Sequence, residues 1–204
     1  MINYSFINFI LGRFEGKGYT QGYIPCRFGT YFGGTQPDRG EPLGVSGVTI
    51  ATGVDLGQQT ITGLAEMGIS AATIAILEPY IGLQKEQAVK KLKASPLTIT
   101  AAQVQEIDNA VSRHYIYETA RKFNRVLFEA APKEVQAVAV SLCYQFGIPR
   151  RDASPALALA WEAMQNSNYE EAAAHLSTPN GWSNSHQKFM NRRRQEAELL
   201  RSVH

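Results

Sequence analysis

Residues 46–58 read SGVTIATGVDLGQ, and this stretch decides how the first part of the chain is understood. The β-branched residues of GVTIATGV are typical of a strand, and the glycine near its end favours a tight turn. Asp55 follows the turn and precedes LGQQT, which is expected to begin a helix. The segment therefore predicts a short strand, a glycine turn, and an aspartate at the start of a helical turn.

The glycines divide the chain into two parts. Twelve of the 17 lie in residues 1–60, which predicts a loop-rich first part with short strands. Three stretches rich in aromatic and β-branched residues are the strand candidates: 19–24, 27–32 and 47–52. Before them, the segment MINYSFINFILGRF predicts an amphipathic helix that ends near Glu15, because Gly16 and Gly18 follow.

Helical periodicity dominates the rest of the sequence. The expected helices are one or two short ones within 61–80 with Ser70 as N-cap, then 85–93, 101–129 behind Thr100, 132–145 with Gly147 as its stop, 154–165, 169–176 and 186–201. Since 132–145 is apolar on almost every side, we expect it to be the central buried helix. The predicted fold class is α+β: one domain over 1–204, with a small β-containing lobe (about 1–60), a larger helical lobe (about 61–204) and a cleft between them.

Composition and charge exclude several classes of protein. The 204 residues are 44% hydrophobic and 19% charged, as in a globular domain, and the net charge is only +2. This balance disfavours charge-driven binding of nucleic acid, and no apolar run reaches the roughly 18 residues that span a membrane. Arg13 follows the apolar N-terminal run, whereas a signal peptide places its positive charge first. We therefore expect delivery by another route, or as part of a larger chain.

The two cysteines form neither a disulfide framework nor a zinc pattern. Cys143 lies in the apolar run VQAVAVSLCYQF and is expected in the core, while Cys26 lies in a loop. A thiol enzyme would need a histidine close in space to one of them, and none is near in the sequence. No metal or organic cofactor is indicated.

Glu15 is the first candidate for chemistry. A carboxylate at a helix C-terminus faces the negative end of the helix dipole, and an apolar neighbour such as Phe14 adds to the effect. Its pKa should therefore rise, which suits a general acid that works near neutral pH. The plainer alternative is a solvated glutamate at a helix end.

Asp55 is the second candidate. It is either a simple N-cap or turn aspartate, or the partner carboxylate of Glu15. Thr49, six residues earlier on the expected strand, could orient a water molecule with its hydroxyl, or be no more than a β-favoured residue. On a regular strand Thr52 faces the side opposite Thr49, so only one of the two should reach a cleft.

The arrangement of these segments resembles a known family. Glu15 and Gly16 end the first helix, a β-rich stretch carries VTIATG, and a helical part follows. This is similar to the phage-type lysozymes, and more closely to the pesticin-like lysozyme domains of bacterial toxins, which share the GVTIATGVDLGQ type of segment. In the helical part, AVAVSLCYQFG, NYEEAAAHL, Trp182 and NRRRQEAELL resemble the central and closing helices of the family. The resemblance covers nearly the whole chain.

The resemblance implies a lysozyme-like fold and a muramidase, which hydrolyses the β-1,4 bond between N-acetylmuramic acid and N-acetylglucosamine in peptidoglycan. Glu15 matches the catalytic acid, Thr49 the threonine that helps to place the attacking water, and Asp55 the pesticin-type aspartate. In the phage pattern the aspartate precedes the threonine, so Asp38 and Glu41 stay open as alternatives to Asp55. The resemblance implies an inverting reaction, which requires carboxyl groups about 6.5–9.5 Å apart, against about 5–5.5 Å for retention.

Other side chains could contact the glycan or hold the fold. The candidates for sugar contact are Tyr19, Tyr23, Tyr31, Phe32, Gln58 and Gln145, each of which could equally serve packing or lie on the surface. The basic cluster, which comprises Lys188, Arg192, Arg193, Arg194 and Arg201, is expected mainly on a solvated helix face balanced by Glu196 and Glu198. One of its arginines could instead bind peptidoglycan carboxylates or hold the helix to the core.

Three other functions stay open. A non-catalytic glycan-binding module would keep binding cell walls after replacement of Glu15, and a lytic transglycosylase would leave an anhydro-sugar end. A nucleic-acid binder would use residues 192–194, although the net charge weighs against it.

The resemblance also implies a setting. Action in the bacterial periplasm or cell wall follows from the substrate, after delivery by a secretion apparatus, a carrier chain or phage lysis. The pesticin-like segment favours an antibacterial toxin or effector over a phage endolysin. The expected partners are peptidoglycan strands and, for a toxin, a cognate immunity protein. We expect a monomer without nucleic acid and without stable membrane insertion.

Overall fold

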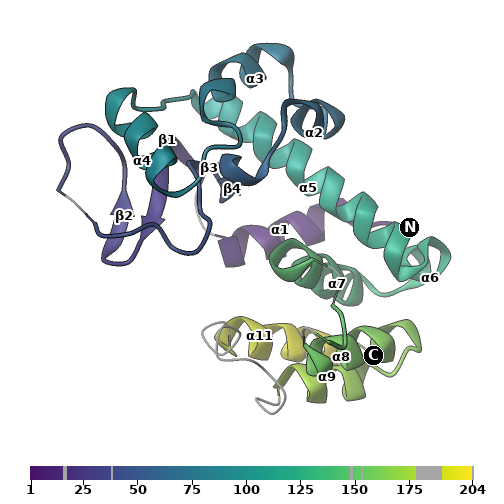
Figure 1. Cartoon of the computed structure of the whole chain (residues 1–204). Helices are drawn as coiled ribbons and strands as arrows, with labels where there is room; N and C mark the ends of the chain where they lie inside the picture. The colour runs from purple at the N-terminus through teal and green to yellow at the C-terminus, as the bar shows by residue number, and fades with distance from the viewer. Residues whose placement is uncertain (16–17, 38, 148, 153, 178–189, 204) are drawn as a thin grey trace. The chain divides into compact units, whose positions relative to one another are not determined.

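The computed structural model describes residues 1–15, 18–37, 39–147, 149–152, 154–177 and 190–203. The chain forms two compact units, and each is described by itself (Figure 1). Unit 1 consists of residues 1–14 and 114–204, and unit 2 consists of residues 15–113. The boundary expected near residue 60 falls inside unit 2, and a single domain over the whole chain stays a prediction.

Unit 2 contains a four-stranded antiparallel sheet in the order β2-β1-β3-β4. The strands are β1 (Tyr19–Cys26), β2 (Gly29–Tyr31), β3 (Thr49–Ala51) and β4 (Val54–Asp55). Along β1 the side chains alternate, so that Ile24 is buried while Tyr23 is half-buried. Such alternation is expected where one face of a sheet lies on the core. The three expected strands are confirmed, the second and third being shorter than predicted.

Short helices complete unit 2. They are η1 (Leu56–Gln58), α2 (Ile61–Glu66), α3 (Ala71–Leu77), η2 (Glu78–Tyr80), α4 (Lys85–Ala94) and the first part of α5 (Ala101–Phe123). Ser70 caps α3 as predicted, because its hydroxyl accepts a hydrogen bond from the backbone N–H of Thr73. Thr100 caps α5 in the same way through Gln103. The hydroxyl caps explain why these helices begin where the sequence placed them.

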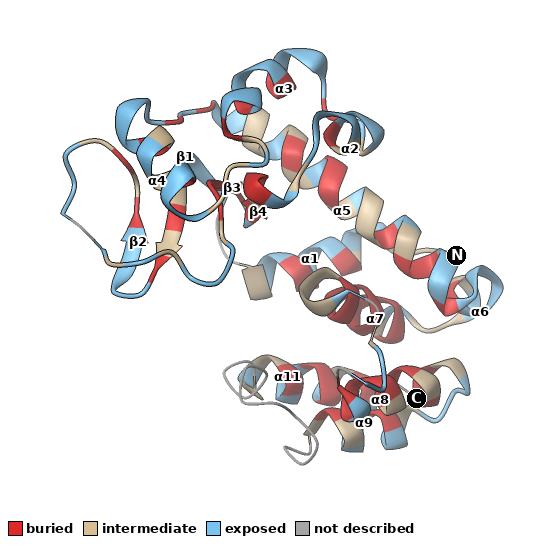
Figure 2. Cartoon of the chain, viewed as in Figure 1, coloured by how far each residue is buried: buried red, intermediate tan, exposed pale blue. Residues whose placement is uncertain are grey.

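Unit 1 is helical throughout its described residues. It holds α1 (Tyr4–Glu15, up to residue 14), the end of α5, α6 (Arg125–Ala130), α7 (Lys133–Phe146), α8 (Pro155–Gln165), α9 (Tyr169–Ser177) and α11 (Met190–Arg201). Every residue of α7 from Val135 to Cys143 is buried, which confirms it as the central helix (Figure 2). Gly147 ends α7 with a positive φ of 69°, as predicted. The first residues of the expected helix 186–201 lie outside the described residues.

The helix expected over 101–129 is broken at Asn124. Asn124 has a φ of 76°, a conformation that asparagine tolerates better than most residues, and its side chain caps α6 at the N–H of Val126. The Gln165 amide donates to the carbonyl oxygen of Phe123 at the end of α5, which satisfies a group freed by the break. One predicted helix is therefore two, α5 and α6.

The described residues thus form ten α-helices, two short 3-10 helices and one small antiparallel sheet, and the fold is lysozyme-like α+β as predicted. Among these residues, none of the helices has the length and apolar character required to cross a membrane.

Candidate active site

Glu15 is the last residue of α1 and is half-buried. Residues 16 and 17 lie outside the described part, and the chain resumes at Gly18. A Cβ on Gly18 would lie 2.5 Å from Cγ1 of Val104 and 3.1 Å from Oγ1 of Thr52. The backbone just beyond Glu15 therefore passes α5 at a distance that only glycine allows.

Strand pairing brings Thr49 and Asp55 together. Thr49 pairs with Asp55 on one side and with Tyr23 on the other, while Ile50 pairs with Val54 across the turn. Directly paired residues project to the same face of a sheet. The six-residue spacing therefore yields a row of Tyr23, Thr49 and Asp55 across three strands. Thr49 is only 5% exposed, so its hydroxyl lies deep in this row.

Two backbone N–H groups hold one oxygen of Asp55. Its Oδ1 accepts from the nitrogen of Gly47 at 3.0 Å and from the nitrogen of Gly57 at 2.9 Å, the second of these bonds capping η1. Within the described part of the chain, its Oδ2 accepts no hydrogen bond. The N-cap alternative is therefore confirmed, and it leaves the second carboxylate oxygen available for chemistry.

The two glycines that hold Asp55 pack against each other. A Cβ on Gly47 would lie 2.4 Å from the carbonyl oxygen of Leu83 and 2.5 Å from Cα of Gly57. A Cβ on Gly57 would lie 2.6 Å from the same oxygen. Both positions thus require glycine for the two N–H groups to converge on one carboxylate oxygen. We call Gly47 and Gly57 the glycine pair.

Electrostatics link Asp55 and Glu15 to Tyr23. Burial raises the pKa of Asp55, and the two N–H bonds oppose this rise. The pKa of Tyr23 is raised to about 12, first by burial and then by the charges of Tyr19, Glu15 and Asp55. Because both carboxylates act on one phenol, Tyr23 is a neighbour that they share.

An aromatic cluster of Tyr19, Tyr23 and Phe32 surrounds this phenol. The ring of Tyr23 lies 4.9 Å from that of Tyr19 and 5.9 Å from that of Phe32, measured between centroids. Tyr19 and Phe32 are themselves 5.8 Å apart. Aromatic faces of this kind suit the apolar faces of sugar rings, so these three sugar-contact candidates lie with the carboxylates.

Tyr31 lies on the other face of the sheet. It pairs with Ile24, the buried neighbour of Tyr23, and it is 5% exposed. Its hydroxyl donates to the carbonyl oxygen of Gly34, and its ring helps to line a pocket of about 170 Å³ together with Arg39. The structure therefore does not bring Tyr31 to Asp55.

The remaining candidates have identifiable neighbours. Gln58 is exposed at the end of η1, three residues beyond Asp55, and donates to the carbonyl oxygen of Val45. Gln145 lies in unit 1, where its amide oxygen accepts a 2.7 Å hydrogen bond from Arg193. Among the alternatives to Asp55, Glu41 is exposed and Asp38 lies outside the described residues.

Thr52 is held by a residue that the sequence analysis did not single out. Its backbone N–H and its hydroxyl both donate to the carboxylate of Asp108 on α5, at 2.9 and 2.7 Å. Thr52 is therefore hydrogen-bonded to α5, whereas Thr49 lies in the row with Asp55. Neither Asp108 nor the glycine pair carries a sequence signal that would stand out before the strand pairing is known.

The basic cluster is not a solvated helix face at two of its arginines. Arg193 is fully buried and its Nη1 lies 2.7 Å from Oε2 of Glu196, which is also fully buried. Arg192 pairs with the same carboxylate at 3.3 Å and lies over the ring of Phe14. The alternative that an arginine holds the helix to the core is therefore confirmed by Arg193, and Arg192 binds the same carboxylate. Arg194 is exposed, and Lys188 lies outside the described residues.

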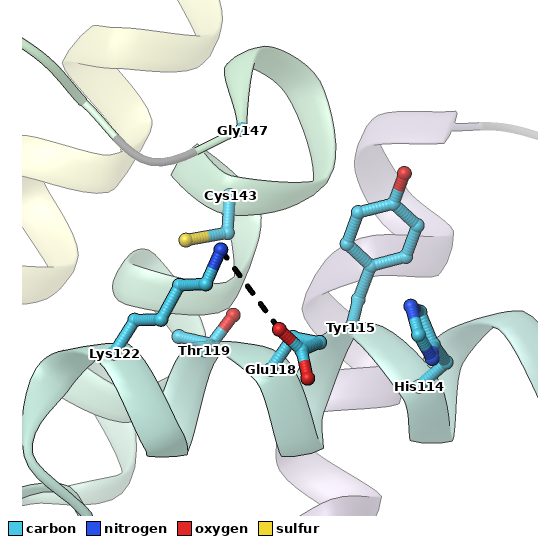
Figure 3. A pocket seen from close by; sticks show the side chains of 7 residues that line it. All are labelled: His114, Tyr115, Glu118, Thr119, Lys122, Cys143 and Gly147. Carbon is cyan, nitrogen blue, oxygen red and sulfur yellow. Dashed lines mark ion pairs between the residues drawn. The ribbon is translucent and has the colours of Figure 1, made fainter.

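Figure 3 shows a pocket of about 210 Å³ in unit 1 that is lined by both Cys143 and His114. A histidine and a cysteine thus line one pocket, but the Cys143 sulfur points away from His114 in Figure 3, whereas a thiol enzyme needs the two in contact. Burial also raises the pKa of the Cys143 thiol to about 11, which keeps it protonated near pH 7. The thiol is a buried core group, as predicted.

A metal site was not expected. Among the described residues, no three or more His, Cys, Asp or Glu side chains come together as metal ligands.

Comparison with known proteins identifies the family of this chain. No curated protein matches the sequence. The family model of pesticin, described as the bacterial toxin homologue of phage lysozyme (C-terminal part), matches residues 6–170. This match covers most of the chain, including the Glu15 helix end, the sheet with Asp55, and the central helix α7. The chain therefore belongs to the pesticin family of bacterial toxin homologues of phage lysozyme.

Proposed function

We propose that the protein is a muramidase that hydrolyses the β-1,4 bond between N-acetylmuramic acid and N-acetylglucosamine in peptidoglycan. Glu15 is the general acid and Asp55 is the base. The observation that supports this most is the row of Tyr23, Thr49 and Asp55 on one face of the sheet, beside an aromatic cluster suited to sugar rings. The family of toxin homologues of phage lysozyme supports the same substrate class.

The proposed reaction needs one proton donor and one proton acceptor. Glu15 gives its proton to the glycosidic oxygen as the bond to the anomeric carbon breaks, and the bonding electron pair stays with that oxygen. Water attacks the anomeric carbon from the opposite face and gives a proton to Oδ2 of Asp55. This inverting route fits the unequal use of the two Asp55 oxygens, because Oδ1 is occupied by backbone N–H groups.

The decisive experiment is digestion of purified peptidoglycan by the wild type and by Glu15→Gln. The wild type should release reducing N-acetylmuramic ends with one water added per cleavage, and the first product should be the inverted anomer. Glu15→Gln should lower the rate by about 10²–10⁴-fold, the range typical of a lost general acid. Anhydro-sugar ends would identify a lytic transglycosylase instead, and wall binding without any cleavage would identify a binding module.

A matched set of variants tests the second carboxylate. Asp55→Asn should lose most of the activity, whereas Glu41→Gln, which changes an exposed acid, should keep nearly all of it. Asp38→Asn belongs in the same comparison. A larger loss in Glu41→Gln or Asp38→Asn than in Asp55→Asn would move the base to the loop before β3.

The proposed setting follows from the substrate. We propose action on the bacterial cell wall by a monomer, as an antibacterial toxin whose producer is protected by an immunity protein. Co-purification of a tight inhibitor encoded beside the gene would support the toxin proposal, and full activity without one in the producing cell's periplasm would contradict it.

A further inference from the structure

Tyr23 is placed to act on the reaction itself. Antiparallel strands lie about 4.8 Å apart, so the Cα atoms of Tyr23 and Asp55, with Thr49 between them, are separated by about 10 Å. Because paired residues project to the same face, the Thr49 side chain stands between those of Tyr23 and Asp55 in this row.

The Tyr23 ring is fixed and its hydroxyl is available. The rings of Tyr19 and Phe32 pack against it, which restricts its rotation. No described residue forms a hydrogen bond with the Tyr23 hydroxyl, although the residue is half-buried. Since the residue is only half-buried, its hydroxyl can form a hydrogen bond with water or with a substrate atom.

From this geometry we infer that Tyr23 is a positioning residue that holds the attacking water against Asp55. The inference rests on the proposed muramidase function. The Tyr23 hydroxyl donates a hydrogen bond to the water oxygen, and the water donates one of its protons to Oδ2 of Asp55. One lone pair of the water is then left for the anomeric carbon.

Tyr23 keeps its own proton throughout the reaction. With a pKa of about 12, the phenol stays neutral over the whole range in which a carboxylate acid and base can work. It is therefore a constant hydrogen-bond donor, while Asp55 takes the proton of the water. Thr49, at 5% exposure, can support the water from below only as a secondary contact.

The test compares Tyr23→Phe with Tyr117→Phe, which removes a hydroxyl from an exposed ring of α5 in unit 1. Rates are measured on soluble, uncrosslinked peptidoglycan strands. Tyr23→Phe should lower kcat about 10–100-fold and leave KM within about twofold, because the lost bond acts on the water and not on the glycan. Tyr117→Phe should change kcat by less than about threefold.

Folding is controlled by the thermal unfolding midpoint and by calorimetric binding of the muropeptide product, both of which should match the wild type in Tyr23→Phe. A wild-type kcat in Tyr23→Phe, an equal loss in Tyr117→Phe, or a rise in KM that accounts for the whole loss would each overturn the Tyr23 assignment and leave the muramidase proposal standing. A wild type that releases no reducing ends would overturn both.

Discussion

Two buried carboxylates, Asp55 in unit 2 and Glu196 in unit 1, are held in opposite ways. Glu196 is fully buried and faces two arginines, Arg193 at 2.7 Å and Arg192 at 3.3 Å, and the hydroxyl of Ser141 also donates to it. Asp55 is half-buried and is held by backbone N–H groups alone, through one oxygen. Burial raises the pKa of both carboxyl groups.

The difference separates a structural carboxylate from a chemical one. A carboxylate neutralised on all sides anchors a helix but has no capacity left to accept a proton from a substrate water. A carboxylate that is held by neutral N–H groups has no opposite charge beside it, and one of its oxygens can still accept a proton. Asp55 is of the second kind, which supports its proposed role as the base.

The largest expected effect is on stability, at Glu196. Glu196→Gln leaves the fully buried Arg193 without its counter-charge, so the free energy of unfolding should fall by about 3–5 kcal/mol. Urea denaturation measures the change. Glu162→Gln is the control, because it breaks the exposed pair with Arg151 and should move the midpoint little. A loss below about 1 kcal/mol in Glu196→Gln would remove the basis of the comparison.

The next effect is at the glycine pair. In Gly57→Ala the new Cβ would lie 2.6 Å from the Leu83 carbonyl oxygen, so the backbone must shift. The two N–H groups of the glycine pair then no longer converge on Oδ1 of Asp55. Unfolding should become easier by about 1–3 kcal/mol, as for other overpacked sites, and wall hydrolysis should fall as well. The free energy of unfolding and the rate of wall hydrolysis are measured on the same purified variant.

The matched control for the glycine pair is Gly12→Ala in α1. Its Cβ meets nothing within 4 Å, so it should stabilise the protein by up to about 1 kcal/mol through helix propensity. If Gly57→Ala and Gly12→Ala had the same stability and the same activity, the hydrogen bonds to Asp55 would not depend on the close backbone approach at the glycine pair.

The smallest expected effect is a gain in stability for Asp55→Asn. Burial raises the folded pKa of Asp55 above its ordinary value of 3.8, so the fold prefers the protonated form. The wild type therefore loses stability as the pH rises from about 3.8 through the folded pKa, and asparagine avoids this loss. Since Asp55 is only half-buried, solvent screening limits the gain at pH 7 to less than about 1 kcal/mol.

Thermal unfolding at about pH 3 and at pH 7 measures this gain. Asp55→Asn should exceed the wild type at pH 7 and match it at pH 3, while its hydrolytic activity is lost. A variant that is less stable than the wild type at pH 7 would place the charge of Asp55 among the groups that stabilise the fold, like that of Glu196.

Local signals predicted most of the fold. Ser70 and Thr100 marked helix starts, Gly147 marked a stop, and the uniformly apolar segment was correctly assigned to the buried helix α7. Asn124 was missed, because an asparagine in a left-handed conformation looks like any polar helix residue until its backbone angle is known.

The site was predictable only in part. Thr49 and Asp55 were chosen by residue type and by the resemblance, but their direct pairing was not predicted. Asp55 was expected at the start of a helical turn and not on a strand that returns after Thr52 and Gly53. The side on which Tyr31 lies depends on the register of β1 with β2, and a shift by one residue exchanges the faces. The burial of the Arg193 side chain depends on Glu196, Ser141 and Gln145, which are brought together by tertiary packing alone.

The two cysteines have a consequence for how the folded chain responds to oxidants. Cys26 and Cys143 are both buried, and burial raises the pKa of the Cys143 thiol to about 11. Protonated, shielded thiols react slowly with disulfides and peroxides. The folded chain should therefore stay reduced under mild oxidation and resist alkylating reagents, whereas unfolding would expose two reactive sulfurs.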